Sequence, residues 1–197
     1  DDIIIMGLNS IESKGNKDLF FNSMAVFDNK LKLLKKYNKV NLVPFGEFIP
    51  FESFLGIIGL KPITNEYHSF SRGSGRNPLN IKNSKINLNI LPLICYEIIY
   101  SGKLSKNKNF DYIFNISEDG WFGSSVGPIQ HFSQSIFRAI ESGKYIIRSA
   151  NNGISAVINP MGIIEQKVEL GLIGYVDLSE AKLIKPTPFM LYGNIIF

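Results

Sequence analysis

Short apolar segments, each about the length of a β-strand, are the feature that most constrains what this chain can fold into. Glycine, asparagine and proline separate them, and these residue types favour turns. We predict strands over Ile3–Leu8, Met24–Phe27, Leu31–Leu34, Ile86–Ile94, Tyr112–Ile116, Tyr145–Ala150, Ile154–Ile158 and Ile163–Val168. The polar triplet Asp28-Asn29-Lys30 predicts a hairpin between two of them. Strands therefore dominate, and the sequence suggests neither an internal repeat nor a domain boundary.

One segment has helical periodicity instead. Gly127-Pro128 would open this helix, since proline is favoured in the first turn. Its predicted apolar and polar faces are Ile129, Phe132, Ile136 and Ile140 against Gln130, Gln134, Arg138 and Glu141. A helix among many strands predicts a mixed α/β architecture of packed layers. The polar stretch Asn65–Asn83 predicts a long loop.

Composition excludes several classes of protein. With 197 residues, 45% hydrophobic and 19% charged, the chain is long enough for one domain with a core and too apolar for a disordered tail. The 21 basic and 17 acidic residues leave a net charge of +4, too small an excess to predict nucleic acid as a partner. The single cysteine rules out an intrachain disulfide. No apolar run reaches the roughly 18 residues that span a bilayer, and the best internal stretch is Phe54–Leu60.

The single cysteine comes directly after a predicted strand. Apolar residues first alternate with asparagines over 86–90, and the strand is then apolar throughout up to Cys95. A tight turn at a strand end can expose a thiol and present the next backbone N–H to an oxyanion, as a cysteine nucleophile requires. Free cysteines are also often buried as small apolar side chains. The residues around Cys95 leave both interpretations open.

A second segment combines a cation with a carboxylate. Lys39 precedes Glu47 by eight residues, with Pro44 and Gly46 between them. A lysine that neutralises a tetrahedral oxyanion has to be held rigidly, and such residues can fix the backbone around it. A single lysine is more often exposed to solvent, so this segment alone does not decide the chemistry.

Taken together, several segments resemble the nitrilase superfamily, and within it the apolipoprotein N-acyltransferase family. The residues that carry the resemblance are Lys39–Pro50, Ser71-Arg72-Gly73, Ile94–Ile98, Asp119-Gly120-Trp121-Phe122-Gly123, Gly127–Phe132 and Arg148–Gly153. They keep the family's order and extend over most of the chain. The resemblance implies an α/β fold, a nitrilase-like α-β-β-α sandwich that is N-terminally incomplete. Residues 1–197 would form one catalytic domain fragment, with residues from about 188 onward leading into a transmembrane helix.

The resemblance also implies a role for each candidate site residue. Cys95 would attack the acyl ester of a phospholipid, and the resulting thioester would pass its acyl group to the N-terminal diacylglyceryl cysteine of an apolipoprotein. Lys39 and the backbone N–H of Tyr96 would hold the oxyanion, and Glu47 would be an additional catalytic glutamate that orients the lysine or the incoming amine. The residues expected to bind substrate are Glu97, Trp121 and Phe122.

The expected partners follow from this chemistry. They are a phospholipid acyl donor, a diacylglyceryl apolipoprotein acceptor and a membrane surface, which the apolar arm Phe51–Leu60 would contact. The resemblance places such a protein in the bacterial inner membrane, with its catalytic domain on the periplasmic face. It implies no cofactor, and His68 and His131 lack the spacing of metal ligands.

Two positions depart from the family pattern. The family's general-base glutamate lies upstream of Lys39, where this chain has only Glu12, in a polar turn. We therefore expect the chain to be inactive when isolated. Glu118 stands where the family usually has asparagine. Two alternatives remain open at this point: a soluble nitrilase-like amidase that hydrolyses a C–N bond, and an inactive fragment that only binds a partner.

Overall fold

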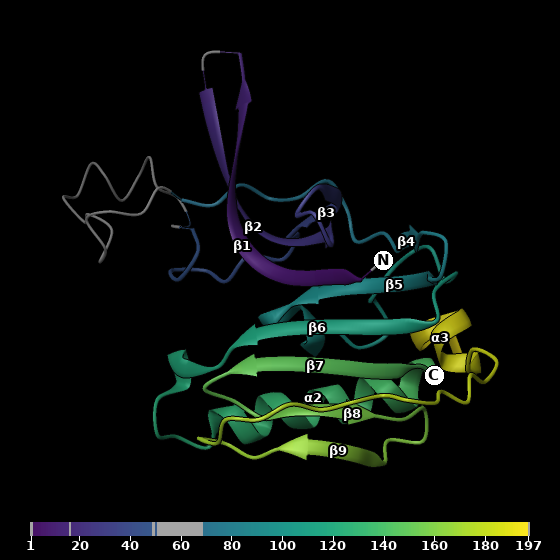
Figure 1. Ribbon diagram of the computed structural model, residues 1–197. Helices are drawn as coiled ribbons and strands as arrows, with labels where there is room; N and C mark the ends of the chain where they lie inside the picture. Colours follow the sequence, from purple (N-terminus) through teal and green to yellow (C-terminus); the bar gives the residue numbers. More distant parts are fainter. Residues whose placement is uncertain (1, 16, 49, 51–68, 197) are drawn as a thin grey trace.

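A computed structural model describes residues 2–15, 17–48, 50 and 69–196 of the chain. Two β-sheets lie against each other, and an α-helix packs on the other face of the larger sheet (Figure 1). The predicted layered α/β architecture is therefore confirmed. The apolar arm Phe51–Leu60, His68 and the first residues of the predicted Asn65–Asn83 loop lie outside the described residues.

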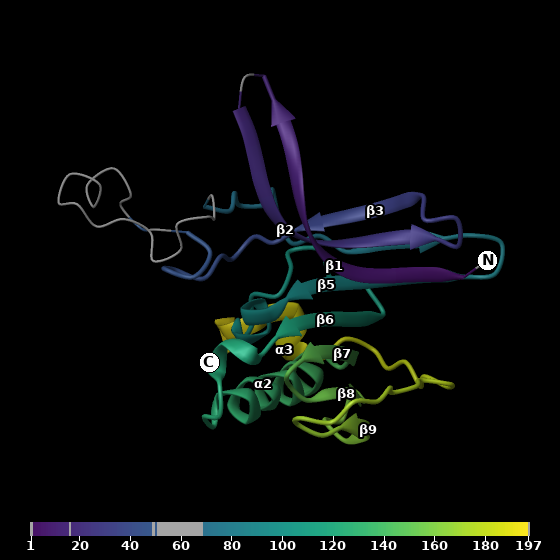
Figure 2. The same cartoon turned by 60° about the vertical axis from the view of Figure 1, so that its left-hand side comes forward.

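The smaller sheet contains three antiparallel strands in the order β1-β2-β3. They are β1 (Ile3–Lys14), β2 (Lys17–Asp28) and β3 (Leu33–Asn38). The predicted hairpin is confirmed, and the Asp28 carboxylate accepts the backbone N–H groups of Lys30 and Lys32 in its turn. Pairing with β3 begins at Ser23, so the far halves of β1 and β2 pair only with each other. They project as a two-stranded ribbon from the body of the molecule (Figure 2).

The larger sheet contains six strands in the order β4-β5-β6-β7-β8-β9. They are β4 (Leu79–Lys82), β5 (Asn87–Ile94), β6 (Tyr112–Glu118), β7 (Tyr145–Asn151), β8 (Ser155–Ile158) and β9 (Ile164–Val168). Strands β5, β6 and β7 are parallel, and the remaining neighbours are antiparallel. The carboxyl ends of the parallel strands therefore meet at one edge, where α/β sheets usually bind their ligands.

Apolar side chains fill both interfaces between the layers. Two buried clusters lie between the sheets, formed by Met24, Tyr37 and Ile94 and by Val26, Ile81 and Ile90. A larger cluster between the six-stranded sheet and helix α2 (Gly127–Ser142) includes Leu91, Leu93, Ile113, Phe132, Ala139 and Ile146. Among the described residues, no helix covers the outer face of the smaller sheet. Three of the four layers of an α-β-β-α sandwich are thus visible.

The orientation of α2 differs from the prediction. Phe132 is buried as expected, but Ile129 and Ile140 are 53% and 47% exposed. Arg138, expected in solvent, is only 4% exposed, and its guanidinium donates to the Ile99 carbonyl and to the Glu141 carboxylate. Polar partners on neighbouring elements therefore outweigh the apolar periodicity of this helix.

The predicted loop over Asn65–Asn83 is also partly wrong. Its last residues form β4, in which Leu79 and Ile81 alternate with polar residues and pair with β5. The chain ends in α3 (Pro188–Tyr192), which packs against α2, and a short helical turn, η3 (Gly193–Ile196). Within the described ranges, no helix is long and apolar enough to cross a membrane.

Candidate active site

Cys95 occupies a sharp turn between β5 and the short helix η1 (Cys95–Ile99). Its backbone has a φ of 49°, in the left-handed region that non-glycine residues rarely adopt. The four residues before it are buried, whereas Cys95 itself is partly exposed. Strained backbone of this kind persists only when the surrounding structure holds it, and such positions cluster at functional sites.

Lys39 and Glu47 form a buried ion pair. The Nζ of Lys39 lies 2.7 Å from Oε2 of Glu47, and their side chains are 2% and 12% exposed. The Glu47 carboxylate also accepts the side-chain amide of Asn22 at 2.7 Å and the backbone N–H of Val43 at 2.8 Å. Phe45, between the pair in sequence, has a left-handed φ of 62°, which tightens this loop. The carboxylate is thus fixed from three directions and in turn fixes the ammonium group.

Glu97 connects the Lys39 segment to the Cys95 turn. It is fully buried, and its carboxylate accepts hydrogen bonds from the hydroxyl of Tyr37 and from the backbone N–H groups of Val40, Asn41 and Ile94. The residues after Lys39 and the residue before Cys95 are therefore held by one side chain. Burial, together with the Glu97 charge, raises the pKa of Tyr37 well above its usual value, so the phenol keeps its proton as a donor.

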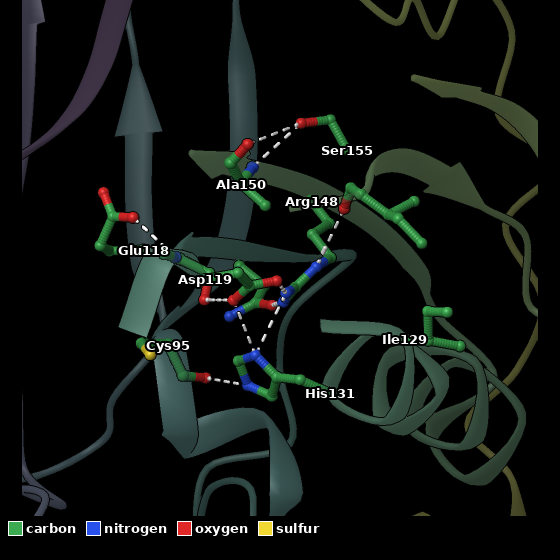
Figure 3. Close-up of polar contacts among 12 residues, drawn as sticks. Cys95, Glu118, Asp119, Ile129, His131, Arg148, Ala150 and Ser155 are labelled. Carbon is green, nitrogen blue, oxygen red and sulfur yellow. Dashed lines mark hydrogen bonds and ion pairs between the residues drawn. The ribbon is translucent and has the colours of Figure 1, made fainter. Parts of the chain in front are cut away.

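A second buried network joins β6 and the residue that follows it to the middle of β7 and to α2 (Figure 3). The Asp119 carboxylate accepts the Ser117 hydroxyl at 2.7 Å and Nη2 of Arg148 at 2.7 Å, and lies 2.9 Å from Nδ1 of His131. Arg148 also donates to the Asn115 side chain and to the Ile154 carbonyl. The other imidazole nitrogen of His131, Nε2, lies 3.2 Å from the carbonyl oxygen of Cys95. The network therefore contacts the backbone of the candidate nucleophile.

Residues 2–181 match the family described as carbon-nitrogen hydrolase. The chain belongs to the carbon-nitrogen hydrolase family. That match extends over nearly all of the chain, and it confirms the nitrilase-like fold predicted from the sequence segments.

Relatives within the family carry a more specific name. The apolipoprotein N-acyltransferase of Bradyrhizobium diazoefficiens is 40% identical over 89% of this chain and 32% of its own length. The protein of the same name from Rickettsia typhi is 39% identical over 98% of this chain and 38% of its own length. The chain thus spans about a third of the length of the relatives it matches.

Solved structures show the same fold at much lower sequence identity. A mutant of the amidase from Nesterenkonia sp. AN1, with acrylamide added at its active-site cysteine, superimposes with a TM-score of 0.56. It is 14% identical, and the match covers 85% of this chain and 59% of the amidase chain. At this identity the likeness concerns the carbon-nitrogen hydrolase fold alone.

The remaining candidate residues lie near the same edge of the sheet. Tyr96 follows Cys95 in η1, and its side chain is 37% exposed. Trp121 and Phe122 lie on η2 (Gly120–Phe122), a helical turn that follows β6. Trp121 is 79% exposed, whereas the Phe122 ring packs on the imidazole of His131 with 5.5 Å between ring centres. The strand ends therefore bring these side chains to one side of the molecule.

Charge is balanced inside the Asp119 network. Burial alone would raise the pKa of Asp119, but the hydrogen bond from His131, the charge of Arg148 and the hydroxyl of Ser117 outweigh it and lower that pKa. Burial lowers the pKa of Arg148, and the charge of Asp119 and its hydrogen bond to Arg148 oppose that change.

The sequence indicated no role for His131 or Arg148, although both lie in segments that carry the family resemblance, and it did not indicate Asn115 at all. Two patterns could have indicated them. Polar residues recur at helical spacing on the buried face of α2, at His131, Ser135, Arg138 and Ser142. Asn115 and Arg148 also interrupt otherwise apolar strands, and buried polar residues are rarely left without partners. Among the described residues, no group of three or more histidines, cysteines, aspartates or glutamates could hold a metal ion.

Proposed function

We propose that this chain is the catalytic domain of a lipoprotein N-acyltransferase of the carbon-nitrogen hydrolase family. The Cys95 thiolate attacks the carbonyl carbon of a phospholipid ester, the ester C–O bond breaks, and a lysophospholipid leaves with a proton. The α-amine of a diacylglyceryl cysteine then attacks the thioester. The C–S bond breaks, an amide forms and the thiol is restored. The names of the relatives and the geometry around Cys95 support this proposal.

The single observation that carries the chemistry is that Lys39 is buried while most of its ammonium donors have no partner in the described part of the chain. Its ammonium group has three N–H donors, and within the described part of the chain only Glu47 pairs with it. The side chain is nevertheless almost completely buried. A desolvated cation with unused donors stabilises a developing oxyanion far better than a solvated one. The backbone N–H of Tyr96, next to the nucleophile, supplies the second oxyanion donor in this proposal.

Glu47 serves as the group that orients Lys39. Both of its carboxylate oxygens are already occupied, Oε1 by Asn22 and Oε2 by Lys39 and Val43. These three donors hold the carboxylate in one orientation, and the carboxylate in turn holds Lys39. In this proposal, a residue other than Glu47 receives the Cys95 proton.

Glu97 is a positioning residue in this proposal and does not contact the substrate. Its complete burial and its bonds to Val40, Asn41 and Ile94 keep its carboxylate away from any ligand. What it contributes is the placement of Lys39 relative to Cys95. Of the three residues expected to bind substrate, this proposal therefore keeps only Trp121 and Phe122, on η2.

Trp121 and Phe122 contact the acyl chain in this proposal. Trp121 follows β6, at the edge of the sheet where Cys95 follows β5, and it presents a large apolar ring to solvent. Exposed tryptophan rings favour contact with lipid at a membrane surface. The proposed partners are accordingly a phospholipid donor, a lipoprotein acceptor and the membrane surface. The proposed location is the periplasmic face of a bacterial inner membrane.

The test uses the full-length protein with a phospholipid that carries a labelled acyl chain. Without an acceptor, mass spectrometry should find the acyl group on the peptide that contains Cys95. Adding a diacylglyceryl peptide should move the label into an amide. Cys95→Ser should lose both products and keep the same thermal unfolding temperature. Label on a different residue would contradict the assignment of Cys95. Release as free fatty acid in the presence of the acceptor would instead indicate a hydrolase.

A further inference from the structure

His131 contacts Cys95 from the side opposite the sulfur. The imidazole is 3% exposed, and its Nε2 lies 3.2 Å from the Cys95 carbonyl oxygen. In Figure 3 the sulfur and the carbonyl of Cys95 point in opposite directions, and only the carbonyl faces the imidazole. His131 is therefore badly placed to take the thiol proton, and any influence on the reaction has to pass through the backbone.

The donor and acceptor roles follow from the chemistry of the partners. A carbonyl oxygen can only accept, so Nε2 carries a proton and donates it to Cys95. Nδ1 faces the Asp119 carboxylate at 2.9 Å and Arg148 Nη2 at 3.3 Å. Asp119 is itself fixed by Arg148 and by its own backbone N–H, which donates to the Asn151 carbonyl at 2.9 Å. Asp119, directly after β6, and Arg148, within β7, thus set the orientation of the ring.

The partner of this hydrogen bond is a strained residue. Cys95 has a φ of 49° without being glycine, so its turn needs external support. Glu97 supports the turn from the preceding residue, through the backbone N–H of Ile94. The His131 bond supports it at Cys95 itself.

We propose that His131 is a positioning residue, which donates Nε2–H to the Cys95 carbonyl and so holds the nucleophile in the left-handed turn that presents its sulfur to the substrate. Asp119 and Arg148 orient the ring, and Phe122 covers it from solvent. The proposal rests on the proposed function only for the identity of the reaction that Cys95 performs.

Two substitutions separate the hydrogen bond from the imidazole ring itself. His131→Gln keeps an N–H donor at about the reach of Nε2 and removes the ring, whereas His131→Leu removes both. Gln130→Ala, on the exposed side of the same helix turn, is the matched control. Each variant is made in the full-length protein, and thermal unfolding shows that it folds.

Two measurements are made on each variant. One is kcat and KM for acyl transfer. The other is the NMR resonance of the Cys95 carbonyl in protein labelled with ¹³C at cysteine carbonyls, assigned by its loss in Cys95→Ser. For His131→Leu we expect kcat to fall about 10²-fold, the effect of a small misplacement of reacting groups, with KM unchanged and the carbonyl resonance moved upfield. His131→Gln should recover most of kcat and keep the resonance near its wild-type position.

Two results would overturn the proposal. One is a His131→Leu protein with wild-type kcat and an unmoved carbonyl resonance. The other is a His131→Gln protein as slow as His131→Leu, which would assign the effect to the imidazole ring and not to its hydrogen bond with Cys95. If the wild-type protein transferred no acyl group, the proposed function would fail, and the carbonyl resonance would still decide whether His131 holds Cys95.

Discussion

Two buried ion pairs belong to this site, and they differ in how many of their hydrogen-bond donors and acceptors have partners. Asp119 and Arg148 are completely buried, and their carboxylate and guanidinium groups are filled by each other and by Ser117, His131 and Asn115. Lys39 is nearly as buried, but Glu47 is the only partner of its ammonium group in the described part of the chain. The closed pair therefore has a structural role, and the open pair is the one that we propose to bind the oxyanion.

The contrast follows from where the pairs lie. Asp119 directly follows β6, Arg148 lies in the middle of the neighbouring parallel strand β7, and both lie between that sheet and α2. Lys39 follows β3, and Glu47 lies in the loop beyond it. Burying charge costs several kcal/mol per ion unless hydrogen bonds compensate it, typically about 3–5 kcal/mol when one partner is removed. In the proposed function, the remaining donors of Lys39 are the ones that bind the oxyanion.

Removing the charge of the closed pair should have the largest effect. Asp119→Asn leaves Arg148 buried without a counterion, which should lower the free energy of unfolding by about 3–5 kcal/mol. Urea unfolding of the purified protein measures this. The control is Glu12→Gln in the exposed Lys36–Glu12 pair, where Glu12 is 45% exposed and the expected loss is less than about 1 kcal/mol. Equal losses in the two variants would contradict the contrast between buried and exposed pairs.

Removing the charge of the open pair should act on rate instead. Lys39→Met keeps the aliphatic stem but removes the oxyanion donor, so acyl transfer should slow by about 10²-fold or more, which corresponds to about 2.7 kcal/mol. Lys39→Arg should not rescue it, since guanidinium presents a wider, planar group. Lys36→Met, on β3 three residues before Lys39, is the control and should leave turnover unchanged. Near-normal turnover in Lys39→Arg would show that the ammonium has no specific role.

Crowding the closed pair without changing its charge should have a smaller effect. A Cβ on Gly153 would lie 2.3 Å from Oδ2 of Asp119, the oxygen that accepts Arg148. Gly153→Ala should therefore cost about 1–3 kcal/mol of stability through overpacking. Gly75→Ala, where the nearest atom is 3.4 Å away at a side-chain end, is the control for unfolding measurements. A Gly153→Ala protein as stable as this control would mean that Asp119 can move without losing Arg148.

Acid should produce the smallest change. The pKa of Asp119 in the folded protein lies below its ordinary value of 3.8, because His131, Arg148 and Ser117 outweigh the effect of burial. The stabilisation from this carboxylate is therefore complete above pH 3.8 and declines as the pH falls through the folded-state pKa. The stability difference between wild type and Asp119→Asn should shrink in this acidic range. A difference that stays constant there would assign the stabilisation to a group other than the Asp119 carboxylate.

Local pattern was sufficient for most of the fold. Alternating or continuous apolar residues predicted the strands of both sheets, and the turn at Asp28 followed from its polar residues. The position of Cys95 after a buried strand was also visible locally. Strand β4 was missed because it is a short edge strand within a polar stretch, and its pairing with β5 makes it a strand.

The candidate site shows where local pattern ends. The sequence by itself determined most of the strands, the long helix, and that a thiol, a lysine and several carboxylates follow strands. Tertiary structure alone decided that Glu97 binds the hydroxyl of Tyr37, 60 residues away, and that Arg148 meets Asp119, 29 residues away. It also turned Arg138 inward. The physical reason is that a buried polar group must find a partner, and when that partner is distant in sequence, only packing of the sheets and helix determines which one it is.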